Sequence, residues 1–116
     1  MINQFIAQGN IGRKIDHEVS AEGKTTVKFS LCIQQHGKYK NNPIWIQCYA
    51  DHRNGEFIYN NCKPGEDITV NGSIMYTKTQ NGTYNWVYVK DVSVHWKGQK
   101  PLQEEDIQEP TAESVF

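Results

Sequence analysis

Residues 25–35 of the chain read TTVKFSLCIQQ and alternate between apolar and polar side chains. One face carries Val27, Phe29, Leu31 and Ile33, and the other carries Lys28, Ser30, Cys32 and Gln34. A period of two residues is the pattern of a β-strand with one face buried and the other open to solvent. This segment therefore predicts a β-sheet fold with a one-sided core.

Four further segments have strand character, namely residues 3–11, 44–50, 67–78 and 84–96. Gly12 is expected to close the first strand, and the polar residues 16–24 to form a loop or hairpin connection. In the fourth strand, Ile68 is expected to share one face with Val70, Gly72 and Ile74.

The segments between these strands predict the connections. Residues 36–43 form a basic loop, and residues 53–63 form a short helix. Pro64-Gly65 is a turn, and Gln80-Asn81-Gly82 contains the Asn-Gly pair favoured in hairpins. Five short strands with one helix before the fourth favour an all-β, partly open Greek-key barrel of the OB type. A β-sandwich is the rival architecture, and it needs more strands than this chain offers.

The composition of the chain changes after Trp96. Of the 116 residues, 37% are hydrophobic, less than the roughly 45–50% of typical globular chains. Residues 1–100 hold all 12 basic residues and 8 acidic ones, whereas residues 101–116 hold 5 acidic residues and no basic one. The total charge of −1 therefore divides into +4 and −5. We expect a barrel domain over residues 1–100 and a disordered acidic tail over residues 101–116. A tail that only aids solubility is the alternative.

The cysteines and histidines form no recognisable metal or catalytic motif. Cys32, Cys48 and Cys62 are odd in number and contain no C-x-x-C pair, which argues against disulfides and zinc. Nucleophile-elbow, Walker A and zinc-protease motifs are absent, so we expect no enzyme, no catalytic residues, no metal and no cofactor. The chain shows no signal peptide and no membrane-spanning run, which predicts a soluble intracellular protein.

Tryptophans and tyrosines stand on the polar faces of the predicted strands, interleaved with lysines. This combination suits single-stranded nucleic acid, because cations follow the phosphates while aromatic faces stack on the bases. Packing of the rings in the barrel or at a subunit interface is the alternative, and it applies most directly to Tyr88 and Trp96. The candidate DNA-binding residues are Arg13, Lys28, Lys38, Tyr39, Lys40, Trp45, Tyr49, Tyr76, Lys78, Tyr84 and Trp86.

In these residues the chain resembles the bacterial and phage single-stranded DNA-binding protein family. The resemblance covers about residues 1–96 and rests on a series of weak motifs: MIN with Gly9 and Gly12, VKFSL at 27–31, WIQCY at 45–49, and KPG with ITVNG at 63–72. It implies an OB fold, base stacking by Trp45 and a second stacking aromatic near Tyr39.

Two positions depart from the family pattern, which places stacking aromatics near residues 51–52 and near Thr79. Neither position is aromatic here. Either Tyr76, Tyr84 or Trp86 compensates, or the affinity for DNA is lower than is usual in the family.

The resemblance also implies a homotetramer, or a dimer, built partly through pairing of first strands. Family members end in an acidic peptide with a hydrophobic tip that recruits replication and recombination proteins, and Glu113, Val115 and Phe116 keep part of that pattern. A phenylalanine ring in an apolar pocket, with its carboxylate on a basic side chain, is suitable chemistry for this contact. The short tail favours a phage or mobile-element protein.

The sequence thus predicts a protein that coats and protects single-stranded DNA without sequence preference, in replication, recombination and repair. Its expected location is the cytoplasm of a bacterial cell or a phage-infected host. One alternative is a primosome-type OB module that bridges replication proteins. Another is an enzyme or an oligosaccharide-binding barrel, which would need convergent carboxylates where the predicted face offers lysines and aromatic rings.

Overall fold

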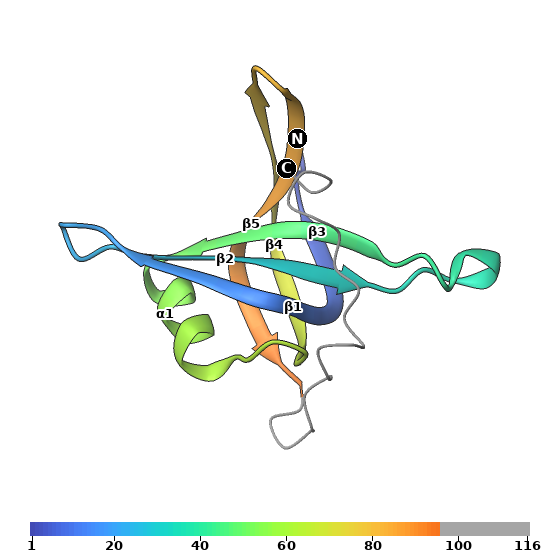
Figure 1. Ribbon diagram of the computed structural model, residues 1–116, viewed down its shortest axis with the longest axis horizontal. Helices are drawn as coiled ribbons and strands as arrows, with labels where there is room; N and C mark the ends of the chain where they lie inside the picture. Colours follow the sequence, from blue (N-terminus) through green and yellow to red (C-terminus); the bar gives the residue numbers. More distant parts are fainter. Residues whose placement is uncertain (96–116) are drawn as a thin grey trace.

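In the computed structural model, which describes residues 1–95, the elements follow one another in the predicted order (Figure 1). The strands are β1 (Phe5–Val19), β2 (Thr25–Ile33), β3 (Ile44–Asp51), β4 (Asp67–Thr79) and β5 (Gly82–Val94). A 3-10 helix, η1 (Gly37–Tyr39), lies between β2 and β3, and helix α1 (His52–Asn61) lies between β3 and β4. Trp96 and the predicted tail over residues 101–116 lie outside the described residues.

The five strands of the described region close into a barrel in the order β1-β2-β3-β5-β4. Closure depends on β1, whose first half pairs antiparallel with β4 and whose second half pairs antiparallel with β2. The pairing between β3 and β5 is parallel. A five-stranded barrel with one helix before the fourth strand is the architecture predicted from the sequence, which is therefore confirmed.

The core fills the barrel interior with alternate side chains of the strands. Val27 and Leu31 are fully buried and Phe29 is 1% exposed, as expected from the alternation over residues 25–35. Each such side chain stabilises the fold by roughly 1.5–3 kcal/mol. Ser30 was expected on the open face and is only 4% exposed, and β2 ends at Ile33. Within residues 1–95, the buried hydrophobic residues are Ile11, Val27, Phe29, Leu31, Cys48, Ala50, Ile58, Cys62, Ile68, Val70, Val87 and Val89.

Helix α1 covers one end of the barrel, below β2 and β3 in the view of Figure 1. It packs against β2, β3 and β5 and buries Ile58 completely. Within residues 1–95, no helix has the length and apolar character needed to span a membrane.

The predicted end of the first strand at Gly12 is wrong, because β1 continues to Val19. The register with β2 is irregular between Ile11 and Ile15, and regular pairing resumes beyond that point. The outward residues of this second half are charged, so the polarity of the segment hid its period of two.

The connection between β1 and β2 is therefore only residues 20–24. The Ser20 N–H donates to the carbonyl oxygen of Lys24 (2.9 Å), and the Lys24 N–H donates to Ser20 Oγ (3.0 Å). Gly23 has a φ of 85°, a conformation that favours glycine. The loop predicted over residues 16–24 thus shrinks to a tight turn at the tip of a two-stranded arm.

Strands β4 and β5 run on beyond the barrel as a hairpin, which stands out at the top of Figure 1. Its turn is Gln80-Asn81, between the paired residues Thr79 and Gly82. Ile74 was expected to share the face of Ile68, and it is 46% exposed because the strand has left the barrel at that point. Beyond the barrel, the hairpin therefore presents side chains on both of its faces.

Candidate nucleic-acid interface

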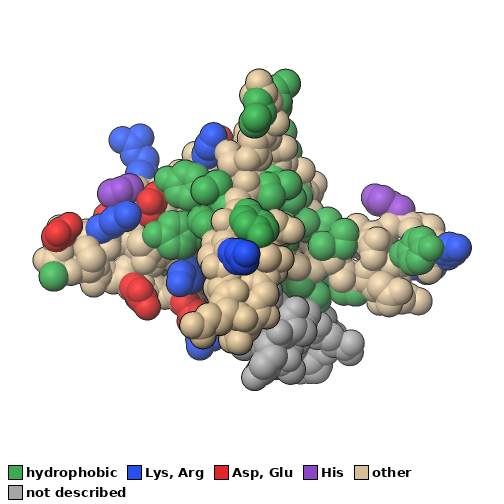
Figure 2. All heavy atoms as spheres, turned by 90° about the horizontal axis from the view of Figure 1, so that it is seen from above, with side chains coloured by type: hydrophobic (Ala, Val, Ile, Leu, Met, Phe, Trp, Pro, Cys, Tyr) green, Lys and Arg blue, Asp and Glu red, His purple; other side chains and the backbone are tan. Residues whose placement is uncertain are grey.

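A groove of about 580 Å³ lies on the outside of the barrel, where β2, β3 and β5 meet the protruding β4–β5 hairpin. This volume falls within the roughly 300–1,000 Å³ of typical ligand pockets. Figure 2, which looks from the hairpin side, shows hydrophobic side chains gathered near the middle of this face. The groove is lined by Lys28, Gln47, Tyr49, Thr77, Thr79, Asn81, Tyr84 and Trp86.

Strand alternation explains why these side chains meet. Lys28 of β2 is paired with Tyr49 of β3, and both belong to the set of positions that face away from the core. In the hairpin, Thr77 is paired with Tyr84 on the corresponding outer face. The groove therefore collects the outward residues of four strands, and none of its lining residues is acidic.

The aromatic rings at the groove form a connected group. The Tyr49 ring meets the Trp86 ring edge to face, with centroids 5.7 Å apart and an interplanar angle of 70°. It also meets the tilted Tyr88 ring at 6.3 Å. The Trp86 Nε1–H donates to Thr77 Oγ1 (2.9 Å), which ties the indole to β4. Such contacts hold the rings in place before any ligand arrives, which lowers the entropy cost of stacking.

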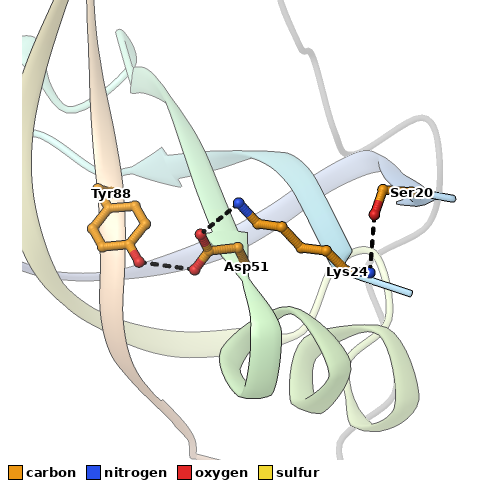
Figure 3. Close-up of polar contacts among 4 residues, drawn as sticks. All are labelled: Ser20, Lys24, Asp51 and Tyr88. Atoms are coloured by element: carbon orange, nitrogen blue, oxygen red, sulfur yellow. Dashed lines mark hydrogen bonds and ion pairs between the residues drawn. The ribbon is translucent and has the colours of Figure 1, made fainter. Parts of the chain in front are cut away.

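A polar cluster fixes Tyr88 (Figure 3). The Tyr88 hydroxyl donates to Asp51 Oδ1 (2.8 Å), and Lys24 Nζ lies 3.6 Å from Asp51 Oδ2. The hydrogen bond to Asp51, together with burial and the nearby negative charge, raises the pKa of Tyr88 above its ordinary value. The phenol therefore stays neutral and keeps its ring beside Tyr49.

Asp51 stands at the position before α1, yet its carboxylate forms no cap hydrogen bond with the helix. Its two oxygens are engaged instead by the Tyr88 hydroxyl and the Lys24 ammonium. The Asp51 side chain is 13% exposed, and its negative charge is paired with the Lys24 ammonium. The family pattern would place a stacking aromatic near residues 51–52. In this structure Asp51 stands there and accepts the hydrogen bond that holds Tyr88 beside Tyr49.

The structure brings four of the eleven predicted binding residues into the groove: Lys28, Tyr49, Tyr84 and Trp86. Trp45 lies on the same outward face of β3, two positions before Gln47, and is half-buried. It is paired with Cys32 of β2, farther along the sheet towards the β2–β3 connection.

Lys38, Tyr39 and Lys40 lie at the β2–β3 end, defined here as residues 34–43. Tyr39 is 51% exposed, and Lys38 Nζ lies 5.2 Å from the centre of its ring. Gln35 Nε2 donates to the carbonyl oxygen of Asn42 (2.6 Å), which ties the two sides of the connection together. Residues 34–43 contain no acidic residue. Figure 2 shows basic and histidine side chains at this end, on the right of the view.

Three predicted residues lie away from the groove. Tyr76 and Lys78 alternate with the groove residues Thr77 and Thr79, so they stand on the opposite face of the hairpin. Tyr76 is 62% exposed there. Arg13 is exposed on β1, in the irregular stretch between Ile11 and Ile15.

Sequence reasoning missed four lining residues: Gln47, Thr77, Thr79 and Asn81. Gln47 could have been found, because it stands between Trp45 and Tyr49 on one face of an alternating strand. Thr77 and Thr79 could be identified as lining residues only from the register of the hairpin. Their neighbours Tyr76 and Lys78 are residue types that more commonly bind nucleic acid. Thr79 lines the groove, and it lies where the family pattern would place an aromatic.

The described residues hold no group of three or more histidine, cysteine or acidic side chains that could bind a metal ion. Burial raises the pKa of Cys48 to about 12, so this thiol is protonated and unreactive near neutral pH. The cysteines within residues 1–95 are all free thiols.

Residues 2–97 match the model of the Single-strand binding protein family, which covers most of the chain and the whole barrel. No curated protein matches the chain.

Proposed function

Because the chain belongs to the single-strand binding protein family, we propose that it coats single-stranded DNA without requiring a particular sequence and protects it during replication, recombination and repair. Members of this family bind DNA without enzymatic activity, so the chain is not an enzyme. The compartment we propose is the cytoplasm of a bacterial cell or a phage-infected host.

The groove is the observation that carries this proposal. It combines the rings of Tyr49, Tyr84 and Trp86 with the ammonium of Lys28 and contains no carboxylate. Aromatic faces stack on any base, because every base has a π-face, and each stacked base contributes about 1–3 kcal/mol. A base inside a duplex is already stacked and paired, so the groove favours the single strand.

A path for the strand leads from the groove towards the β2–β3 end. Along it lie the outward residues Gln47 and Trp45 of β3, followed by Tyr39 with Lys38 and Lys40. This path keeps Trp45 and Tyr39 as proposed stacking residues and supplies cations for the phosphates. Tyr76 and Lys78 lie on the other hairpin face, where they would contact DNA only if the strand wraps around the hairpin.

Binding to a labelled oligo-dT, compared with a duplex of equal length, tests this function. Lys28, Lys38 and Lys40 would each neutralise about one phosphate, which predicts a log–log salt slope near −2 for a single strand. The affinity for the single strand should therefore fall about 20-fold between about 50 and 200 mM salt. Equal binding to the duplex, or none to either, would contradict the proposal; the latter result would favour the primosome-type alternative.

A matched pair of variants checks the charge assignment. Lys38→Gln should make the slope shallower by about 0.7, the contribution of one phosphate contact on a single strand. Lys63→Gln removes an exposed lysine after α1, outside the proposed path, and should leave the slope unchanged.

We propose a homotetramer as the assembled state, with a dimer as the alternative. The family membership supports this, together with the exposure of apolar residues at the start of the chain. Ile6 of β1 is 62% exposed, and Ile2 is 89% exposed. Light scattering of the full chain should give four times the mass of a single chain, and a monomer would contradict the proposal.

We also propose that the DNA-binding domain ends near residue 100 and that the acidic tail after it has a separate role. We propose that Glu113, Val115 and Phe116 dock on replication and recombination proteins. Deleting residues 113–116 should abolish capture of these partners and leave the affinity for DNA unchanged or higher, because the tail competes as a polyanion. A lower DNA affinity after the deletion would contradict this role.

A further inference from the structure

Three separate parts of the chain meet at the carboxylate of Asp51, the last residue of β3. Its Oδ1 accepts a hydrogen bond from the hydroxyl of Tyr88 in β5 (2.8 Å). Its Oδ2 lies 3.6 Å from Nζ of Lys24, the last residue of the turn between β1 and β2. Both carboxylate oxygens are therefore engaged by side chains from other elements (Figure 3).

The strands that carry these side chains are already held together by their backbones. Asp51 is paired with Thr26 of β2, and Tyr88 is paired with Tyr49 at the parallel contact between β3 and β5. Backbone pairing fixes where a side chain begins, but it leaves the side-chain dihedral angles free to rotate. The main effect of the hydrogen bond therefore falls on the orientation of the Tyr88 ring.

The Tyr88 ring connects the carboxylate to the groove. Its centroid lies 6.3 Å from that of the Tyr49 ring, and the Tyr49 ring in turn meets Trp86 edge to face at 5.7 Å. Both separations fall within the roughly 4.5–7 Å at which aromatic rings attract one another. Tyr49 and Trp86 line the groove. A Tyr88 ring that turned away would leave Tyr49 without its contact on that side.

We propose that Asp51 is a positioning residue of the DNA-binding groove, which holds the Tyr88 hydroxyl and thereby keeps the Tyr49 ring in the orientation that stacks on a base. This inference rests on the proposed binding of single-stranded DNA. It assigns to Asp51 an effect on affinity although its carboxylate repels phosphate. Without the hydrogen bond, the DNA has to immobilise a side chain that the free protein leaves mobile, which weakens binding.

Charge and position act in opposite directions at Asp51, which allows them to be separated. Loss of the carboxylate removes a negative charge and releases the Lys24 ammonium, so charge alone predicts tighter binding of DNA. Asparagine removes the charge as alanine does, but its amide still bonds to the Tyr88 hydroxyl, because both groups can donate and accept. Asp51→Ala and Asp51→Asn are therefore matched in charge and differ in the hydrogen bond.

The affinities of these two variants for an oligo-dT of about 15 nucleotides, and for an abasic strand of the same length, test the proposal. Asp51→Ala should bind the oligo-dT about fivefold more weakly than Asp51→Asn does. This ratio corresponds to about 1 kcal/mol, the typical cost of immobilising one side chain. The two variants should bind the abasic strand equally, because that strand offers phosphates and no base to stack.

Tyr88→Phe gives a second test that leaves every charge in place. It removes the hydroxyl and keeps the ring, so it should lower the affinity for oligo-dT about fivefold relative to the wild type. Tyr59→Phe is its control, because Tyr59 is an exposed tyrosine of α1 that lines no part of the groove. This control should change the affinity less than twofold.

The outcomes separate this inference from the proposed function. Equal binding of oligo-dT by Asp51→Ala and Asp51→Asn, or wild-type affinity in Tyr88→Phe, would overturn the positioning role and leave the proposed function standing. A fivefold difference on the abasic strand as well would also overturn it, since that result would show a general loosening of the barrel. Failure of the wild-type protein to bind any single strand would overturn the proposed function itself.

Discussion

Replacing Trp86 with alanine is expected to weaken binding of single-stranded DNA by about 5- to 140-fold. The range is the loss of one stacked base, about 1–3 kcal/mol, converted at 1.4 kcal/mol per factor of ten. The upper end is favoured because Trp86 also supports Tyr49 by their edge-to-face contact. Fluorescence anisotropy of a labelled oligo-dT at low salt measures the change without relying on tryptophan emission.

Tyr59→Ala is the matched control for this prediction. Tyr59 is an exposed aromatic of α1, 52% accessible, and its ring stacks on His17 with centroids 3.6 Å apart. It lines no part of the groove, so its loss should change DNA affinity less than twofold. A Trp86→Ala protein that melts like the wild type and binds oligo-dT equally well would show that the groove is not the stacking site.

The second large effect concerns stability. A Cβ on Gly72 would overlap the carbonyl oxygen of Tyr88 and lie 2.9 Å from its carbonyl carbon and 3.2 Å from Val89 Cα. These atoms are backbone, so relief requires β4 and β5 to separate where the register already shifts between Asn71 and Gly72. Gly72→Ala should therefore cost about 3 kcal/mol or more.

Such a loss is a large part of the roughly 5–15 kcal/mol that stabilises a domain. It should lower the Tm by more than about 10 °C in a thermal melt followed by circular dichroism. Ser93→Ala, at an exposed position of β5, is the control and should shift the Tm only slightly. A Gly72→Ala protein with the wild-type Tm would show that the two strands are not held as closely as described.

Much of the barrel could be predicted because apolar and polar residues alternate within its strands, which is a local signal. In β2 and β3 one side of the pleat is apolar and the other polar, as Phe29 and Lys28 show. The second half of β1 was missed because both of its faces carry polar residues and its pairing with β2 is a long-range property. The second half of β1 is a strand because it pairs with β2.

The candidate site was predictable in residue types and less so in arrangement. Tyr49 and Trp86 could be proposed from composition alone, but their contact joins residues from strands far apart in sequence. The choice of Thr77 over Tyr76 depends on which hairpin face meets the groove, which a sequence pattern does not encode. The same holds for Asp51 and Tyr88, whose hydrogen bond spans 37 positions of the chain.

Photocrosslinking tests whether a single strand lies in this groove against its aromatic rings. An oligo-dT with 5-iodouracil in place of thymine is irradiated on the full-length protein, and the attached residues are located by mass spectrometry. We expect attachment at Tyr49, Tyr84 or Trp86. Attachment confined to Tyr59 or to Tyr76, on surfaces that face away from the groove, would contradict it.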